Sequence, residues 1–316
     1  MYAFIVDHSV SEQLRLAEVP EPVPAANELI VQVEAISLNY GELAFGVWHS
    51  PDGSVLGYDA AGTVIRGARD GSGPDVGTRV LTVGAAGGWA ELRSVATDLV
   101  GVVPSGADVA TMSAGGTAGA TALRAVRKLG SVLAKRVLIT GSSGGVGRFA
   151  VQLARRAGAH VVAATRDPEQ DAELRALGAH EIVRHPADLD TPAAGVIDMV
   201  GGSHLQTSYT KLASGGTLVS VGHAAEAVAA FDYVAMFADP DARDRHDRTI
   251  VSLHLPAEIG LADDLCWLGR EMAEGRLDPQ VKRRGDWRDL HEAASLLINQ
   301  KLHGKAVLTV RDPTTP

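Results

Sequence analysis

The stretch VLITGSSGGVGRFAVQLA, residues 137–154, decides the fold class. Its apolar start is typical of a buried strand, and Val146, Ala150 and Leu153 then recur at helical spacing. The glycine-rich turn between them allows close backbone approach, and the helix start presents unpaired N–H groups to a phosphate. The pattern predicts a nucleotide-binding strand–turn–helix unit, although a plain strand-to-helix turn with a glycine cap is an alternative. The predicted cofactor-binding residues of the turn are Ser142, Ser143, Gly144, Gly145, Val146 and Gly147.

The next predicted strand, HVVAAT at 160–165, indicates which cofactor the unit binds. Folds that prefer NAD place a carboxylate at the end of this strand to hold the ribose 2′-hydroxyl. This chain has Thr165 and Arg166 there, and Arg184 or His185 is expected nearby. A guanidinium pairs well with a 2′-phosphate, so the strand end favours NADPH over NADH. The alternative for Arg166 is a solvated loop residue.

Composition excludes several classes of function. The net charge of −9 comes without a basic stripe, which argues against a nucleic-acid partner. The single cysteine, Cys266, excludes disulfides within the chain and every multi-cysteine metal site. No segment reads as a signal peptide or a membrane span, so we expect a cytoplasmic protein without a membrane partner.

The glycine turn also satisfies T-G-x-x-x-G-x-G, the cofactor turn of short-chain dehydrogenases. Those enzymes carry it near the start of the chain and need a Tyr-x-x-x-Lys pair downstream. Here the turn begins at residue 140, and none of the five tyrosines has a lysine four residues later. The short-chain family is therefore disfavoured.

The whole chain instead resembles the medium-chain dehydrogenase/reductase superfamily, in its zinc-free quinone oxidoreductase and enoyl reductase branch. The likeness is carried, besides the glycine turn, by VQVEAISLNYGEL (31–43), LGYDAAGTV (56–64), VGTRVLTVG (76–84), GGWAEL (87–92), GGTAGATAL (115–123), GVIDMVGG (195–202), GGTLVSVG (215–222) and HGKAVLTV (303–310). Several such blocks in the expected order are more specific than any single motif.

The resemblance implies an α/β protein of two domains. A GroES-like, mostly antiparallel β catalytic domain is expected from residues 1–113 and 256–316. A Rossmann NADP-binding domain with a parallel, doubly wound sheet is expected from residues 114–255. The resemblance also implies a homodimer, joined through an edge strand near TIVSLHL at 249–255.

The resemblance also implies the remaining site residues. Asn39, Tyr40 and Tyr58 match catalytic positions, with Asn39 near the nicotinamide ribose or the substrate. The positions that flank the cofactor match Thr117, Gly222, His223 and Leu253. Zinc enzymes of the superfamily hold their metal where this chain has Asn39, Tyr58 and a residue near Ser113; none is a preferred zinc ligand, so no metal is expected. Tyr40 as a packing residue and Tyr58 as a filler of the zinc volume are the alternatives.

Without a Lewis acid, the acceptor itself must spread the incoming negative charge. We therefore expect an NADPH-dependent oxidoreductase whose partner is a small electrophilic acceptor, a quinone or an α,β-unsaturated carbonyl such as an enone or enoyl thioester. One alternative is a dedicated enoyl reductase of a polyketide-like biosynthetic pathway. Another, from a different class, is a catalytically weak NADPH-binding sensor or structural protein.

Overall fold

The computed structural model describes residues 1–231, 236 and 246–310. Contacts divide the chain into unit 1, Met1–Ala120 with Leu255–Pro316, and unit 2, Thr121–His254. The boundaries that the sequence suggests, 113/114 and 255/256, remain predictions.

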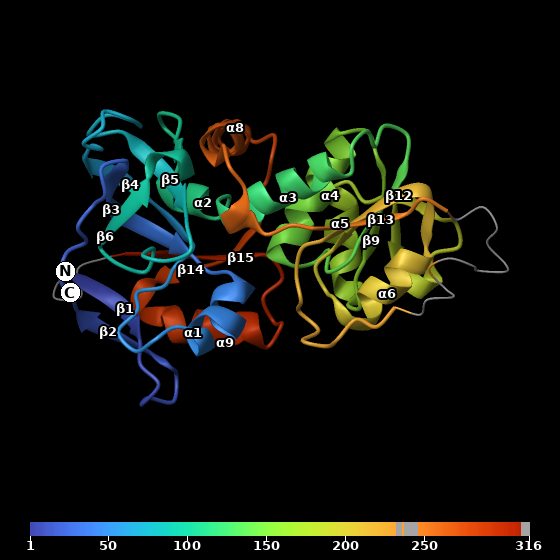
Figure 1. Ribbon diagram of the computed structural model, residues 1–316, viewed down its shortest axis with the longest axis horizontal. Coiled ribbons are helices and arrows are strands. Elements are labelled where there is room, and N and C mark those ends of the chain that lie inside the picture. The colour runs from blue at the N-terminus through green and yellow to red at the C-terminus, as the bar shows by residue number, and fades with distance from the viewer. Residues whose placement is uncertain (232–235, 237–245, 311–316) are drawn as a thin grey trace. The chain divides into compact units, whose positions relative to one another are not determined.

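Unit 2 is built on a parallel sheet of six strands; β9, β12 and β13 are labelled in Figure 1. The strands are β8 (Arg136–Ile139), β9 (His160–Ala164), β10 (Glu181–Val183), β11 (Ala193–Asp198), β12 (Leu212–Ser220) and β13 (Thr249–Ser252). Their order is β10-β9-β8-β11-β12-β13, and every neighbouring pair is parallel. This is the doubly wound order of dinucleotide-binding folds, in which ligands bind beyond the carboxyl ends of the strands. The predicted fold class is confirmed for this unit.

Helices cover the sheet of unit 2. Helix α3 (Thr117–Lys128) begins in unit 1 and continues into unit 2. The other helices of unit 2 are α4 (Gly145–Arg156), α5 (Asp171–Ala176) and α6 (Gly202–Thr210), with short turns η3 (Pro168–Gln170) and η4 (Pro186–Asp188). Helix α4 packs on β8 and β9, and α6 packs on β11 and β12. Val137, Leu138 and Ile139 of the first strand are fully buried, because a parallel sheet is covered on both faces.

Unit 1 is mostly antiparallel β structure. Its strands are β1 (Tyr2–Val6), β2 (Leu14–Glu18), β3 (Glu28–Ser37), β4 (Asp59–Arg66), β5 (Arg79–Val83), β6 (Leu92–Ala96), β7 (Val100–Val102), β14 (Val281–Asp286) and β15 (Lys305–Thr309). The main sheet has the order β14-β15-β3-β4-β5-β7, with β6 paired to β3 and only β14–β15 parallel. The expected antiparallel β domain is thus confirmed.

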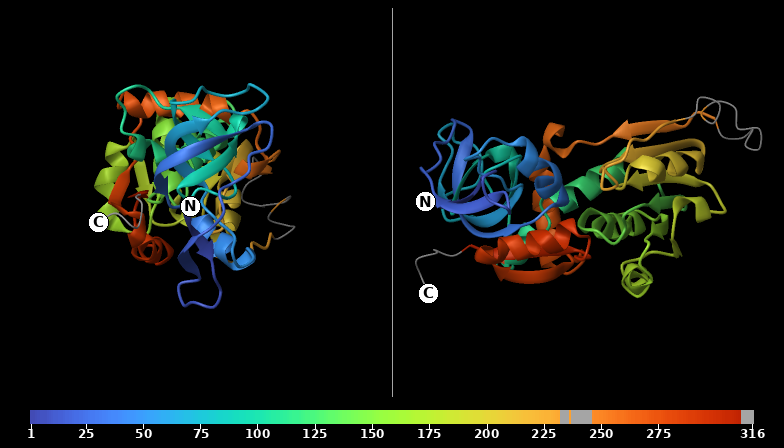
Figure 2. Two further views of the ribbon diagram at one scale, coloured as in Figure 1. Left: turned by 90° about the vertical axis from the view of Figure 1, so that its left-hand side faces the viewer. Right: turned by 90° about the horizontal axis from the view of Figure 1, so that it is seen from below.

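The end of the chain returns to its beginning within unit 1. Strand β15 pairs antiparallel with β3, so the red C-terminal elements lie beside the blue N-terminal strands in Figure 2. The remaining helices are the π-helical turn η1 (Glu42–Gly46), α1 (Val47–His49), α2 (Val109–Ser113), α8 (Leu261–Ala273) and α9 (Leu290–Ile298), with short turns η2 (Thr97–Leu99), η5 (Leu255–Ala257) and η6 (Trp287–Asp289). Trp89 and Trp287 are fully buried in the core. Among the residues described, no helix combines the length and apolar character that crossing a bilayer requires.

Candidate functional site

The glycine turn of unit 2 leads from β8 into α4 as the sequence predicts. Gly144 precedes the helix, and no side chain caps the helix start. A Cβ added to Gly147 would collide with the carbonyl oxygen of Gly141 and lie 2.6 Å from Cα of Ser142, so the helix and the loop pack backbone to backbone. The turn therefore leaves its N–H groups uncapped by side chains, which is what a pyrophosphate requires.

Both serines of the turn make contacts inside the protein. The hydroxyl of buried Ser142 donates to the carbonyl of Ala164 at 2.8 Å and ties the turn to the end of β9. The carbonyl of Ser143 accepts from Nε of Arg148 at 2.9 Å. The hydroxyl of Ser142 thus holds the shape of the turn.

Arg148 is a residue of this site that sequence reasoning missed. Its side chain is fully buried, and besides Ser143 it contacts the side-chain oxygen of Gln170 at 2.5 Å and pairs with Glu173 at 2.8 Å. It therefore braces the glycine turn against η3 and α5. The sequence could have indicated this role. Arg148 directly follows the last glycine, so it lies near the start of the helix, from where its side chain reaches back to the loop.

The end of β9 offers no free carboxylate. The nearest one, Asp167, accepts from the N–H of Glu169 and from the side chain of Gln170, so it caps η3. Arg184, one of two predicted neighbours of Arg166, is held by two bonds to Asp171, at 2.8 and 2.5 Å. His185 is the neighbour that keeps a ring nitrogen uncommitted, since only its Nδ1 accepts a bond, from the N–H of Ala187 at 3.1 Å.

The remaining predicted cofactor residues lie at the ends of β12 and β13 in unit 2. The N–H of Gly222 donates to the carbonyl of Asp198, and a Cβ there would approach Met199 to 2.6 Å. His223 follows it and lies against Gly201. Leu253 is buried and its N–H bonds to Ser220. These three strand-end positions therefore share the sheet edge to which β8 and β9 deliver the glycine turn and Arg166.

In unit 1, Asn39 lies in a buried polar cluster rather than alone. Its side-chain oxygen accepts from Nζ of Lys305 at 2.7 Å, and its Nδ2 donates to the Asp59 carboxylate at 2.8 Å. Lys305 also donates to the carbonyl of Leu38 at 2.8 Å and lies 3.4 Å from Asp59. An ammonium needs an acceptor and a carboxylate needs a donor, so the two together fix which way the amide of Asn39 faces.

Asp59 and Lys305 were both missed by sequence reasoning as site residues. The side chain of Asp59 is fully buried, with 0% of its surface exposed, and that of Lys305 is 3% exposed. The available signal was a charged residue inside an apolar block, LGYDAAGTV for one and HGKAVLTV for the other, because buried charges need partners.

Thr117, at the start of α3, binds the same carboxylate. Its N–H and its hydroxyl both donate to Oδ1 of Asp59, each at 2.6 Å. Asp59 therefore stabilises the N-terminus of α3 as a helix-capping anion does. Because the hydroxyl hydrogen is committed to Asp59, the Thr117 oxygen is left to act toward a ligand as an acceptor.

Two further ionisable groups are buried in this cluster. Glu42 accepts from the N–H groups of Asn39 and Tyr58, yet burial, followed by the charge of Asp59, raises its pKa to about 8. Arg93 donates to Thr82, Tyr58 and Ala86, and burial lowers its pKa to about 10. The cluster therefore contains two acids and two bases in a region closed to water.

The two candidate tyrosines differ in their surroundings. Tyr58 follows Gly57 immediately before β4, and its hydroxyl makes no hydrogen bond to any residue that the structure describes. Burial, followed by the charge of Glu42, raises the pKa of Tyr58, so the hydroxyl keeps its proton at neutral pH. The Tyr40 ring packs edge-on against Phe45 with centroids 6.5 Å apart.

The donor set at the predicted metal position does not fit zinc. Nζ of Lys305 already lies against the oxygens of Asn39 and Asp59, where a metal ion would compete with its positive charge. The hydroxyl of Ser113 is engaged by the carbonyl of Ala110 at 2.7 Å. Across residues 1–231 and 246–310, no three His, Cys, Asp or Glu side chains gather in a metal-binding arrangement.

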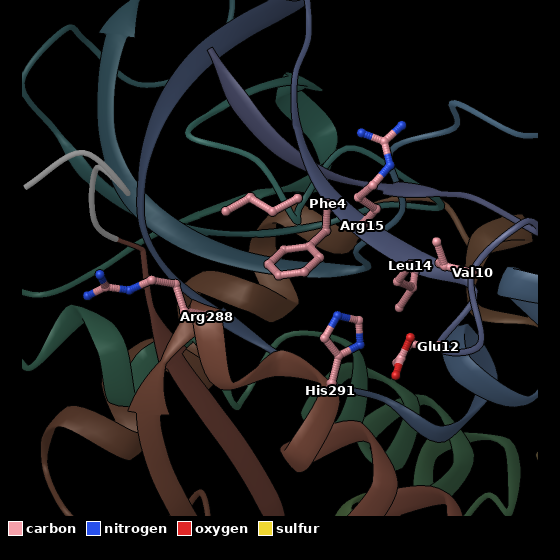
Figure 3. A pocket seen from close by; sticks show the side chains of 8 residues that line it. Phe4, Val10, Glu12, Leu14, Arg15, Arg288 and His291 are labelled. Carbon is pink, nitrogen blue, oxygen red and sulfur yellow. The ribbon is translucent and has the colours of Figure 1, made fainter.

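A separate open pocket of about 330 Å³ lies in unit 1 (Figure 3). Phe4 and Leu14 form its apolar wall, and His291 packs edge-on against Phe4. Its two arginines are engaged elsewhere, Arg15 with Asp7 and Arg288 with Asp286. None of the predicted site residues lines it, so it is distinct from the candidate site.

Comparison with known proteins identifies the family of the chain. A family model described as zinc-binding dehydrogenase matches residues 145–239. An acrylyl-CoA reductase of Ruegeria pomeroyi is 32% identical over 236 residues, 67% of this chain and 68% of that protein. A Bacillus subtilis protein whose name describes a quinone oxidoreductase is 33% identical over 184 residues, 53% of this chain and 56% of that one.

A solved mycobacterial structure, a complex with NADPH, shares the fold over 98% of this chain and 100% of its own, with a TM-score of 0.85 and 24% identity. The sequence matches thus span just over half and about two thirds of the two relatives, whereas the fold matches from end to end. The chain belongs to the medium-chain dehydrogenase/reductase superfamily, in its quinone oxidoreductase and enoyl reductase branch.

Proposed function

We propose that this protein is an NADPH-dependent reductase of quinones or α,β-unsaturated carbonyls that works without zinc. The observation that carries the proposal is the end of β9, where Arg166 follows the strand and the carboxylate of Asp167 caps η3. The neighbouring strand, β8, leads into the glycine turn, whose helix start has no side-chain cap. A relative named as an acrylyl-CoA reductase and one named as a quinone oxidoreductase support the two acceptor classes.

The residues of unit 2 fit NADPH in both charge and shape. The N–H groups at the start of α4, those of Gly145, Val146 and Gly147, would hold the pyrophosphate, and Gly144 lies directly before them. Arg166 and His185 would hold the 2′-phosphate, and Gly222, His223 and Leu253 would flank the nicotinamide half. When bound, NADPH supplies the hydride; the protein supplies position and charge.

In unit 1, the acceptor oxygen needs a donor for the charge that hydride transfer creates. Tyr58 suits that role because its hydroxyl is protonated and unpartnered within the described structure, and Tyr40 is the second candidate. Asn39 would act by holding the loop that carries Tyr40, since its amide is engaged by Lys305 and Asp59. The oxygen of Thr117 would accept a hydrogen bond from the nicotinamide carboxamide.

The deciding experiment measures NADPH oxidation with a panel of quinones and a panel of enones and enoyl thioesters. Turnover of either class supports the proposal, and activity on one enoyl thioester with indifference to quinones favours the dedicated enoyl reductase. Tight NADPH binding without turnover of any acceptor overturns the enzymatic proposal in favour of the sensor alternative. Stoichiometric zinc in the purified protein would overturn the zinc-free part.

The cofactor preference has its own test. Arg166→Ala removes a charge-assisted hydrogen bond, worth about 1.5–3 kcal/mol, so the Kd of NADPH should rise about ten- to a hundredfold. The Kd of NADH should not change, because NADH has no 2′-phosphate. Equal Kd values of the wild type for the two cofactors would contradict the preference.

We also propose a cytoplasmic homodimer that joins through β13. This strand ends the six-stranded sheet in the described part of unit 2, and its Ile250 is 39% exposed. An unpaired, partly apolar edge is a ready surface for a second copy of the sheet. Light scattering that finds a monomer at micromolar concentration would remove this proposal.

A further inference from the structure

Two histidines of unit 2 pack against each other outside the glycine turn. His185 lies at the start of η4, after β10, and His204 lies in the first turn of α6, after β11. Their ring centroids are 4.5 Å apart with planes at 62°, an edge-to-face contact. Nothing in the sequence motifs marks His204.

The bonds of His185 determine which of its nitrogens carries the proton. Its Nδ1 accepts from the N–H of Ala187, so Nδ1 has no hydrogen and the neutral ring carries it on Nε2. Its own backbone N–H donates to Asp188, which closes a reciprocal cap on η4. In this tautomer the Nε2–H of His185 is a donor that no residue in the described part of the chain accepts.

Unlike His185, His204 has no ring nitrogen held by a hydrogen bond within the described structure. Burial chiefly lowers its pKa, and the charges of His185 and Arg166 lower it further, while Asp198 opposes them. The ring is therefore neutral at pH 7 in the protein alone, with a nitrogen ready to accept a proton.

The carboxylates around His204 are already bonded to other donors, so they do not neutralise the positive charge of Arg166. Asp198 is buried and accepts from the hydroxyl of Thr140 at 2.6 Å and the N–H of Gly201 at 2.8 Å. Asp188 is committed to the cap of η4. His223, which lies against Gly201 before the start of α6, adds a further imidazole. The surroundings thus favour an added anion.

We propose that His204 is a specificity residue for the cofactor's 2′-phosphate, and that it takes up a proton when the phosphate binds. The dianion would be held by the Arg166 guanidinium, the Nε2–H of His185 and the imidazolium of His204. NADPH binding would then consume one proton from solvent, whereas NADH binding would consume none. This inference rests on the proposed NADPH-dependent function and adds to it a pH-dependent choice between cofactors.

The chemistry of a phosphate monoester beside a neutral imidazole predicts this uptake. At pH 7 the monoester is mostly dianionic, since its second pKa is about 6. Two negative charges next to the ring favour the charged imidazolium and raise its pKa on binding. The preference for NADPH should therefore weaken as pH rises above neutrality, because the proton becomes harder to obtain.

Calorimetric titration in two buffers of different ionisation enthalpy measures the proton count directly, without turnover. At pH 7 the wild type should take up about half to one proton with NADPH and with 2′,5′-ADP, and none with NADH, 5′-AMP or inorganic phosphate. His204→Asn should lose the uptake and raise the Kd of NADPH about tenfold, with the Kd of NADH unchanged. His8→Asn, which changes a histidine of unit 1 paired with Asp52, is the matched control and should behave as wild type.

The outcomes separate the two proposals. NADPH binding without proton uptake, or uptake that persists in His204→Asn, overturns the role of His204 and leaves the proposed function standing. Equal weakening of NADPH and NADH overturns it too, because it indicates a merely structural residue. Should His204→Asn fail to fold, His204→Gln serves as the second variant. Failure of the wild type to bind either NADPH or 2′,5′-ADP overturns the proposed function itself.

Discussion

The ammonium group of Lys305 lies 2.7 Å from the side-chain oxygen of Asn39, a residue 266 positions earlier in the chain. The same ammonium lies 3.4 Å from Asp59, whose other oxygen holds the start of α3 through Thr117. One buried cation therefore links the candidate catalytic loop, the strand β4 and a helix start.

Lys305→Met should lower the free energy of unfolding by about 3–5 kcal/mol, because it leaves the carboxylate of Asp59 buried without its cation. Urea unfolding measures the loss. Lys301→Met, four residues earlier and exposed, is the control and should change the free energy by less than about 0.5 kcal/mol. If Lys305→Arg does not restore most of the stability, the ion pair is not the cause.

Glu42 should make stability fall as pH rises. Its pKa is about 8 in the folded chain against 4.5 as a model group, so between these values the folded state holds a proton that the unfolded state releases. The stabilisation is complete below pH 4.5 and is lost through pH 8, at up to about 1.4 kcal/mol per pH unit. Urea unfolding across pH 5–8 should show this slope in the wild type and not in Glu42→Gln.

The control for Glu42 is Glu21→Gln, which changes an exposed carboxylate and should keep the wild-type slope. Glu42→Gln also loses an acceptor for one of the N–H groups of Asn39 and Tyr58, a constant cost that does not vary with pH. The slopes, and not the absolute free energies, are therefore compared. Identical slopes in wild type and Glu42→Gln would show that Glu42 is ionised throughout.

Tyr58→Phe should lower kcat about a hundredfold with little change in KM, because it removes a proton donor and almost no contact area. Steady-state kinetics with the preferred acceptor measures both constants. Tyr40→Phe tests the second candidate, and Tyr2→Phe in β1 is the control. An unchanged kcat in Tyr58→Phe with a reduced one in Tyr40→Phe would transfer the donor role to Tyr40.

Gly147→Ala should abolish NADPH binding, since the new Cβ meets the backbone of Gly141 and Ser142, which cannot yield without opening the turn. Gly67→Ala in unit 1 is the control, because its Cβ would meet no atom within 4 Å. Fluorescence titration with NADPH compares them. Wild-type binding by Gly147→Ala would mean that the turn does not need close helix packing.

The sequence by itself determined the strand–turn–helix unit of unit 2 and the place of its glycine turn, because both follow from local order. An apolar strand, a glycine turn and a helix of residues 137–154 are neighbours in the chain, and their chemistry is readable without knowing where the rest lies. Arg166 at the end of β9 was readable for the same reason, as the absence of a carboxylate is a property of one short segment.

Only the tertiary structure decided how the polar residues are paired. The resemblance implies that Asn39 lies near the nicotinamide ribose or the substrate, and the structure adds that its amide pairs with Lys305 of β15 and Asp59 of β4. The hydroxyl of Ser142 turns to Ala164. A buried polar group bonds whatever donor or acceptor the fold brings within about 3 Å, and residues hundreds of positions apart meet only when the sheets form.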